Sequence, residues 1–91
     1  MLLQVLSNQP DKVSPYFGDD DVSIVLMQDG VYMLSLLLQE VPAPRVFVLE
    51  QDWLASGLAH QRIFEGKQIN LINPMQWVAM TTEHFNVVTV Q

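Results

Sequence analysis

A buried strand that runs directly into a helix start decides the fold of this chain; residues 22–32 read Val22-Ser23-Ile24-Val25-Leu26-Met27-Gln28-Asp29-Gly30-Val31-Tyr32. The first six residues are mostly apolar and partly β-branched, which is typical of a strand buried on both faces. The Gln28-Asp29-Gly30 turn then predicts a sharp exit into a helix. Because sites in open parallel sheets form where strands end at their carboxyl edge, we expect a site or a subunit contact here.

Strand-like and helix-like segments alternate along the rest of the chain. Strands are predicted over residues 2–6, 22–27, 45–49 and 69–72, and residues 87–90 have the pattern of a last edge strand. Helices are predicted over 31–39, from Glu50 to a left-handed cap at Gly57, and from Pro74 with Asn73 as the N-cap. This alternation predicts a single α/β domain over residues 1–91, with a mostly parallel central sheet of four to five strands flanked by helices. The sequence alone leaves residues 8–21 and 85–91 undecided.

The composition predicts a chain that needs partners. Hydrophobic residues make up 49% of its 91 residues and charged residues only 15%. A domain of this size buries only about 60–65% of its unfolded surface. We therefore expect other subunits to cover part of the apolar surface, above all the helix over residues 31–38, which is apolar almost all round.

The charge pattern disfavours nucleic acids and anionic membranes as direct ligands. The net charge is −6, and the four basic residues are scattered at Lys12, Arg45, Arg62 and Lys67. Phosphate neutralisation needs clustered cations, which this pattern does not provide. The N-terminus lacks the features of a signal peptide, and no stretch approaches the roughly twenty apolar residues of a membrane span. We expect a cytoplasmic protein.

Few residues here carry chemistry of their own. The chain has no cysteine, and therefore no disulfide, thiolate nucleophile or persulfide. His60 and His84 lack metal-ligand spacing, and the acidic run Asp19–Asp21 does not match a calcium loop. No glycine-rich phosphate loop is present. We expect no catalytic residue, no cofactor and no metal site on this chain.

The junction after the second strand has two compatible interpretations. Asp29 is expected to cap the following helix, and the same region is expected to contact another subunit. A general-acid role for Asp29 requires a partner base, and the sequence offers no obvious one. Trp53 suits a small core and an interface hot spot equally well. The candidate interface residues are Gln28, Asp29, Gly30, Tyr32, Met33, Leu36 and Trp53.

Four segments, taken in order, resemble the DsrH/TusB family: residues 1–7, 24–31, 46–58, and Trp77–Met80 followed by His84. The most specific pieces are Leu26-Met27-Gln28-Asp29-Gly30-Val31 and the Asp-x-x-Ala-x-Gly-Leu pattern over residues 52–58. The chain departs from the family's pattern at Ser56, where a basic residue often stands, and in a shorter segment between the first two strands.

The resemblance implies the DsrE/DsrF/DsrH-like fold and a place in a heterohexamer of three related chains. Such complexes relay persulfide sulfur, and the TusB, TusC, TusD form delivers it towards 2-thiouridine at the tRNA wobble position. In that form a cysteine of the TusD-like subunit carries the sulfur. The resemblance thus implies TusC-like and TusD-like partners for this chain.

Three hypotheses about function follow. The first is a non-catalytic, structural subunit of such a sulfur-relay complex, supporting tRNA wobble uridine 2-thiolation. The second is a self-assembling homologue, a homo-oligomer that uses the same faces for an unassigned role. The third, ranked last, is a small-molecule enzyme that uses Asp29, with Tyr32 or His60 as helper.

Overall fold

The computed structural model, which describes residues 1–91, contains a five-stranded sheet in the order β4-β3-β2-β1-β5. Every pair of neighbouring strands is parallel. The predicted α/β class and parallel sheet are therefore confirmed, and residues 87–90 do form the edge strand. The strands are β1 (Leu2–Val5), β2 (Ser23–Leu26), β3 (Val46–Leu49), β4 (Asn70–Ile72) and β5 (Val87–Val90).

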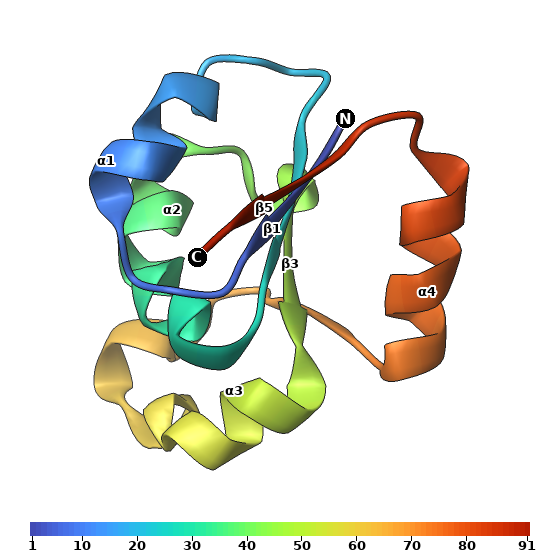
Figure 1. Cartoon of the computed structure of the whole chain (residues 1–91). Helices are drawn as coiled ribbons and strands as arrows, with labels where there is room; N and C mark the ends of the chain where they lie inside the picture. The colour runs from blue at the N-terminus through green and yellow to red at the C-terminus, as the bar shows by residue number, and fades with distance from the viewer.

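Helices cover both faces of this sheet, but unequally. Figure 1 shows α1 and α2 on one side, α3 across the lower end of the sheet, and α4 alone on the other side; Trp53 of α3 belongs to the same buried cluster as residues of α1 and α2. None of the helices is long and apolar enough to cross a membrane. The α-helices are α1 (Pro10–Val13), α2 (Leu34–Glu40), α3 (Glu50–Ser56) and α4 (Pro74–Glu83); the short 3₁₀ helices are η1 (Ser14–Tyr16), η2 (Gln28–Met33), η3 (Ala43–Arg45), η4 (Leu58–His60) and η5 (Arg62–Phe64).

The alternation of side chains along each strand divides the core into two parts. Leu3 and Val5 of β1 belong to a cluster of 17 buried hydrophobic residues on the side of α1–α3. Leu2 of the same strand belongs to a cluster of only four buried residues, against which Trp77 and Met80 of α4 pack. We call these two regions the α1–α3 side and the α4 side.

The segment 28–40 is more buried within its own chain than its composition predicts. Val31, Met33, Leu34 and Leu37 are at most 1% exposed, and all four lie in the core of the α1–α3 side. The whole chain exposes 5384 Å². That area is close to the ~5400 Å² of a compact monomer of this mass. The expectation that other subunits bury the 31–38 helix is thus wrong for most of its apolar residues, because the sheet already covers them.

Two helix ends confirm the capping predictions. Gly57 follows α3 with φ 76°, the left-handed conformation that glycine adopts without a Cβ clash. Asn73 accepts the N–H of Gln76, and the Gln76 side chain accepts the N–H of Asn73, which makes a full capping box for α4.

A single arginine orders the weakly patterned segment before β2. Arg45 donates to the carbonyl oxygens of Val22, Phe17 and Tyr16 at 2.8, 2.8 and 3.0 Å. Its guanidinium therefore satisfies the backbone of a turn that has no strong propensity of its own. Residues 10–16 form α1 and η1. The sequence alone left this segment undecided, because Pro15 interrupts its helical pattern.

Candidate functional site at the carboxyl edge of the sheet

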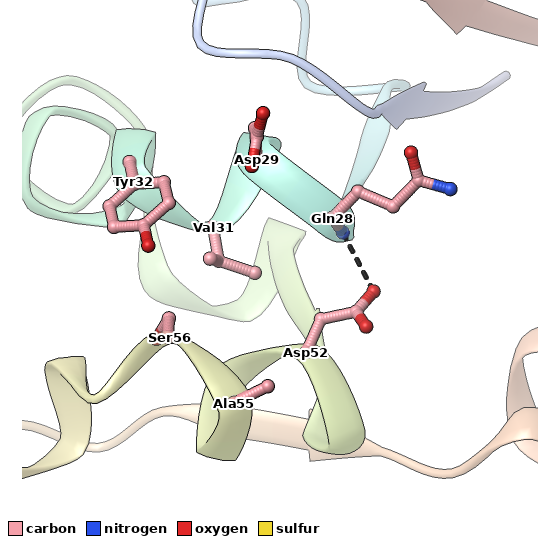
Figure 2. A pocket seen from close by; sticks show the side chains of 7 residues that line it. All are labelled: Gln28, Asp29, Val31, Tyr32, Asp52, Ala55 and Ser56. Carbon is pink, nitrogen blue, oxygen red and sulfur yellow. Dashed lines mark hydrogen bonds between the residues drawn. The ribbon is translucent and has the colours of Figure 1, made fainter.

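A shallow pocket opens where β2 and β3 end and their helices begin. Its volume is about 180 Å³, and Figure 2 shows the side chains that line it. One wall comes from η2 and the other from α3. The lining residues are Gln28, Asp29, Val31, Tyr32, Asp52, Ala55 and Ser56. The structure thus places the pocket at the sheet edge where the sequence predicts a site.

Gln28 turns the chain out of β2 in an uncommon backbone conformation. Its φ is 50°, which makes it the one non-glycine residue with positive φ. A side chain in this region costs about 1 kcal/mol, because Cβ approaches the following carbonyl. The Gln28 N–H donates to Asp52 Oδ2 at 2.7 Å, and this bond from the first turn of α3 holds the turn in place (Figure 2).

The prediction that Asp29 caps the following helix is wrong. Met27 occupies the N-cap position of η2, and no side chain makes a capping bond there. Asp29 is exposed, and its carboxylate points away from Asp52. The carboxylate that accepts a backbone N–H at this junction is that of Asp52 instead. Sequence reasoning missed this role because Asp52 lies 24 positions further along the chain.

Gly30 is required by a close approach between η2 and β1. A Cβ added at Gly30 would lie 2.0 Å from the Val5 carbonyl oxygen. The same carbonyl accepts the N–H of Met27 at 3.0 Å. Gly30 therefore allows η2 to pack closely against β1. It is buried and does not line the pocket.

The remaining polar groups of the pocket give it an acceptor-rich character. Ser56 Oγ is already engaged, since it donates to the Trp53 carbonyl at 2.6 Å and accepts the N–H of Leu58 at 3.2 Å. Asp52 already accepts the Gln28 N–H through Oδ2, so the groups without a hydrogen bond inside the chain are the exposed Asp29 carboxylate, Asp52 Oδ1 and the half-exposed Tyr32 phenol. Carboxylates that face solvent suit hydrogen-bond donors or cations from another molecule. His60, the helper considered for Asp29, is not among the lining residues, whereas Tyr32 is.

The seven candidate interface residues separate into exposed and buried groups. Gln28, Asp29 and Tyr32 are exposed beside one another at the pocket, and Leu36 is half-buried. Gly30, Met33 and Trp53 are buried inside the chain and present no surface to a partner. Trp53 packs edge-on against Phe64, with ring centroids 5.0 Å apart. Of the two roles that the sequence left open for Trp53, the structure supports the core role. For the exposed Gln28, Asp29 and Tyr32, a role in a subunit interface stays a prediction.

The charged side chains are not arranged for metal binding. The structure places no three His, Asp or Glu side chains where they could hold one ion together. The acidic run Asp19–Asp21 instead forms a local turn, in which Asp19 Oδ1 accepts the N–H of Asp21 at 3.0 Å.

Comparison with known protein families gives a match that agrees with the fold. The model of a family described as DsrH like protein matches residues 6–87 of the 91 residues. No curated protein matches this chain. The matched region includes β2, β3 and β4 in full, the whole pocket and α4. The chain therefore belongs to the DsrH-like family, whose members are subunits of sulfur-relay systems.

Proposed function

We propose that this chain is an accessory subunit of a cytoplasmic sulfur-relay complex that supports 2-thiolation of the tRNA wobble uridine. The observation that carries the proposal is the family match over residues 6–87. The chain has no cysteine, so a persulfide in such a complex has to be carried by another subunit. TusC-like and TusD-like chains are the partners that this role requires.

The pocket at the carboxyl edge supports a contact role for this subunit. Gln28, Asp29 and Tyr32 project from one short 3₁₀ helix, so a partner can engage all three at once. Tyr32 is 49% exposed, and a half-exposed tyrosine offers both apolar area and a hydroxyl to a partner. We propose that these three residues contact the sulfur-carrying subunit.

The first experiment tests the pathway. The gene is deleted in its native cell, and 2-thiouridine at the wobble position is measured by mass spectrometry of digested tRNA. We expect the modification to fall strongly and to return with the wild-type gene. Unchanged 2-thiouridine in the deletion strain contradicts the proposed pathway.

The second experiment tests the contact surface. An affinity-tagged chain is purified from the same cell and its co-purifying subunits are identified. We expect the charge reversal Asp29→Lys and the truncation Tyr32→Ala to lower the yield of the cysteine-bearing partner at least about tenfold, as removal of an interface hot spot does. Asp20→Lys is the matched control, because Asp20 is an exposed acid outside the pocket. Equal yields from all variants contradict this assignment of the surface.

A further inference from the structure

The outer edge of β5 is an unprotected strand edge. β5 ends the sheet, and β1 is the strand that it pairs with. In Figure 1 no helix crosses the outer side of β5. Its sequence, Val87-Val88-Thr89-Val90, is β-branched throughout, without charge, proline or glycine. Proteins commonly blunt exposed edges with charges, prolines or bulges, and the four residues of β5 include none of these. The opposite edge strand, β4, is only three residues long and is followed directly by Asn73 and Pro74.

The backbone of β5 presents free pairing groups at alternate residues. The carbonyl oxygens of Asn86 and Val90 accept the N–H groups of Leu2 and Leu6 at 2.8 and 2.9 Å, so the even-numbered residues bond to β1. Backbone groups alternate in direction along a strand. The N–H and C=O groups of Val87 and Thr89 therefore point outward, away from the sheet.

We infer that β5 pairs antiparallel with β5 of a second copy of this chain, about a two-fold axis at Val88, and so joins two sheets into one. In this register each outward-facing Val87 lies opposite Thr89 of the second copy. Residues opposite each other in such a position exchange both of their N–H···O bonds. The contact is self-complementary, as a closed two-fold dimer requires, and it leaves no β5 edge free for further addition.

The charges around β5 favour the same partner. From Gln68 to Gln91 the only charged side chain, with His84 neutral, is Glu83, so two copies that each carry a net charge of −6 can approach at this surface with little repulsion. Lys12 Nζ donates to the Gln91 carbonyl at 3.1 Å, which places a cation at the far end of β5. The fully exposed Phe85, two residues before β5, adds apolar surface next to the paired strands.

The inference does not rest on the proposed function, because it concerns the chain alone. The purified chain is examined by analytical ultracentrifugation from about 1 to 500 μM, the range in which small interfaces dissociate. We expect a reversible monomer–dimer equilibrium. A chain that stays monomeric throughout this range, or one that forms an open series of oligomers, overturns the inference.

Two variants at one position and one control locate the contact. Val87→Pro removes an outward N–H at the first residue of the strand, where proline is tolerated, and Val87→Lys adds a charge without altering the backbone. We expect each to weaken the dimer at least about tenfold. Val78→Lys is the control, since Val78 is 55% exposed on α4 and outside β5. A dimer that is lost in Val78→Lys and kept in both Val87 variants overturns the inference, because α4 would then form the contact.

Amide hydrogen exchange gives a readout that does not depend on any variant. As the concentration of the wild-type chain rises, we expect the amides of Val87 and Thr89 to become protected, while those of Val88 and Val90, already bonded towards β1, change little. Concentration-independent exchange at Val87 and Thr89 in a sample that contains dimers overturns the proposed pairing.

Discussion

The two faces of the sheet are made from the same five strands, yet they differ sharply in how much they bury. The α1–α3 side holds 17 buried hydrophobic residues, and the α4 side holds four. No residue of α4 is fully buried, and its Met75 and Val78 side chains are 82% and 55% exposed. Burial of apolar area is the main favourable term in folding, so the α1–α3 side supplies most of the stability.

This difference shows where the apolar excess of the sequence goes. Most of it is buried within the chain on the α1–α3 side, including the helix that the composition singled out for subunit contacts. What remains exposed gathers partly around α4 and β5, at Met75, Val78, Phe85 and Val87. Regions with few buried apolar contacts open locally at low free energy. The α4 side is thus expected to open locally at a lower free energy than the α1–α3 side.

The largest effect is expected from truncating the α1–α3 side. Trp53 is 4% exposed and packs edge-on against Phe64. Trp53→Ala should lower the free energy of unfolding by about 3–5 kcal/mol, from lost burial and the cavity left behind. Urea unfolding followed by circular dichroism measures this loss. A loss below about 1.5 kcal/mol contradicts the claim that this side dominates stability.

A smaller but still large effect is expected where η2 meets β1. The Cβ of Gly30→Ala would lie 2.0 Å from the Val5 carbonyl oxygen, so backbone has to move. We expect a loss of about 1–3 kcal/mol in the same unfolding experiment, the usual range for overpacking. Gly18→Ala is the matched control, because nothing lies within 4 Å of its added Cβ. Equal stability of the two variants would show that η2 yields at no cost.

The elements that the sequence predicted well are those with strong local signals. The alternation of apolar strands and helix starts was enough for the parallel α/β sheet, and the Asn73-Pro74 pair was enough for the start of α4. Gly57 gave the end of α3 for the same reason. In each case a few neighbouring residues determine the conformation, so no tertiary contact had to be known.

The elements that the sequence did not predict depend on distant contacts. Asp52 holds the Gln28 turn across 24 positions, and Arg45 orders the 16–22 segment across 23 to 29 positions. Spacing along the chain gives no sign of either bond. The burial of Met33 likewise depends on which helix face the sheet covers, and a helix that is apolar almost all round does not reveal that face. The burial of Trp53 depends on its packing against Phe64, another contact that spacing does not show.

On the α4 side a truncation should cost less than on the α1–α3 side. Met80 is half-buried and packs at the margin of the four-residue cluster. Met80→Ala should lower the free energy of unfolding by about 1 kcal/mol, since only part of its side chain leaves water. Leu37→Ala is the matched comparison, because Leu37 is 0% exposed in the larger cluster and should lose about 2–5 kcal/mol. Equal losses would remove the distinction between the two sides.

The smallest effect is expected at Gln28, and its sign is opposite to the others. Glycine adopts φ 50° without the Cβ clash, so Gln28→Gly relieves the local strain, although the more flexible unfolded chain offsets part of the gain. We expect a net stabilisation of about 0.5 kcal/mol, seen as a higher urea midpoint. Gln61→Gly is the control, because Gln61 is exposed with an ordinary φ of −81° and should become slightly less stable.

Strain at Gln28 has a consequence for binding as well as for stability. A residue held in an unfavourable conformation is often kept for its side chain or for the geometry that it imposes. If Gln28 contacts a partner, Gln28→Gly should raise the urea midpoint and at the same time lower the yield of the co-purified partner. A variant that gains stability and keeps its full partner yield would assign Gln28 to the turn alone, and would leave Asp29 and Tyr32 as the contact residues of the pocket.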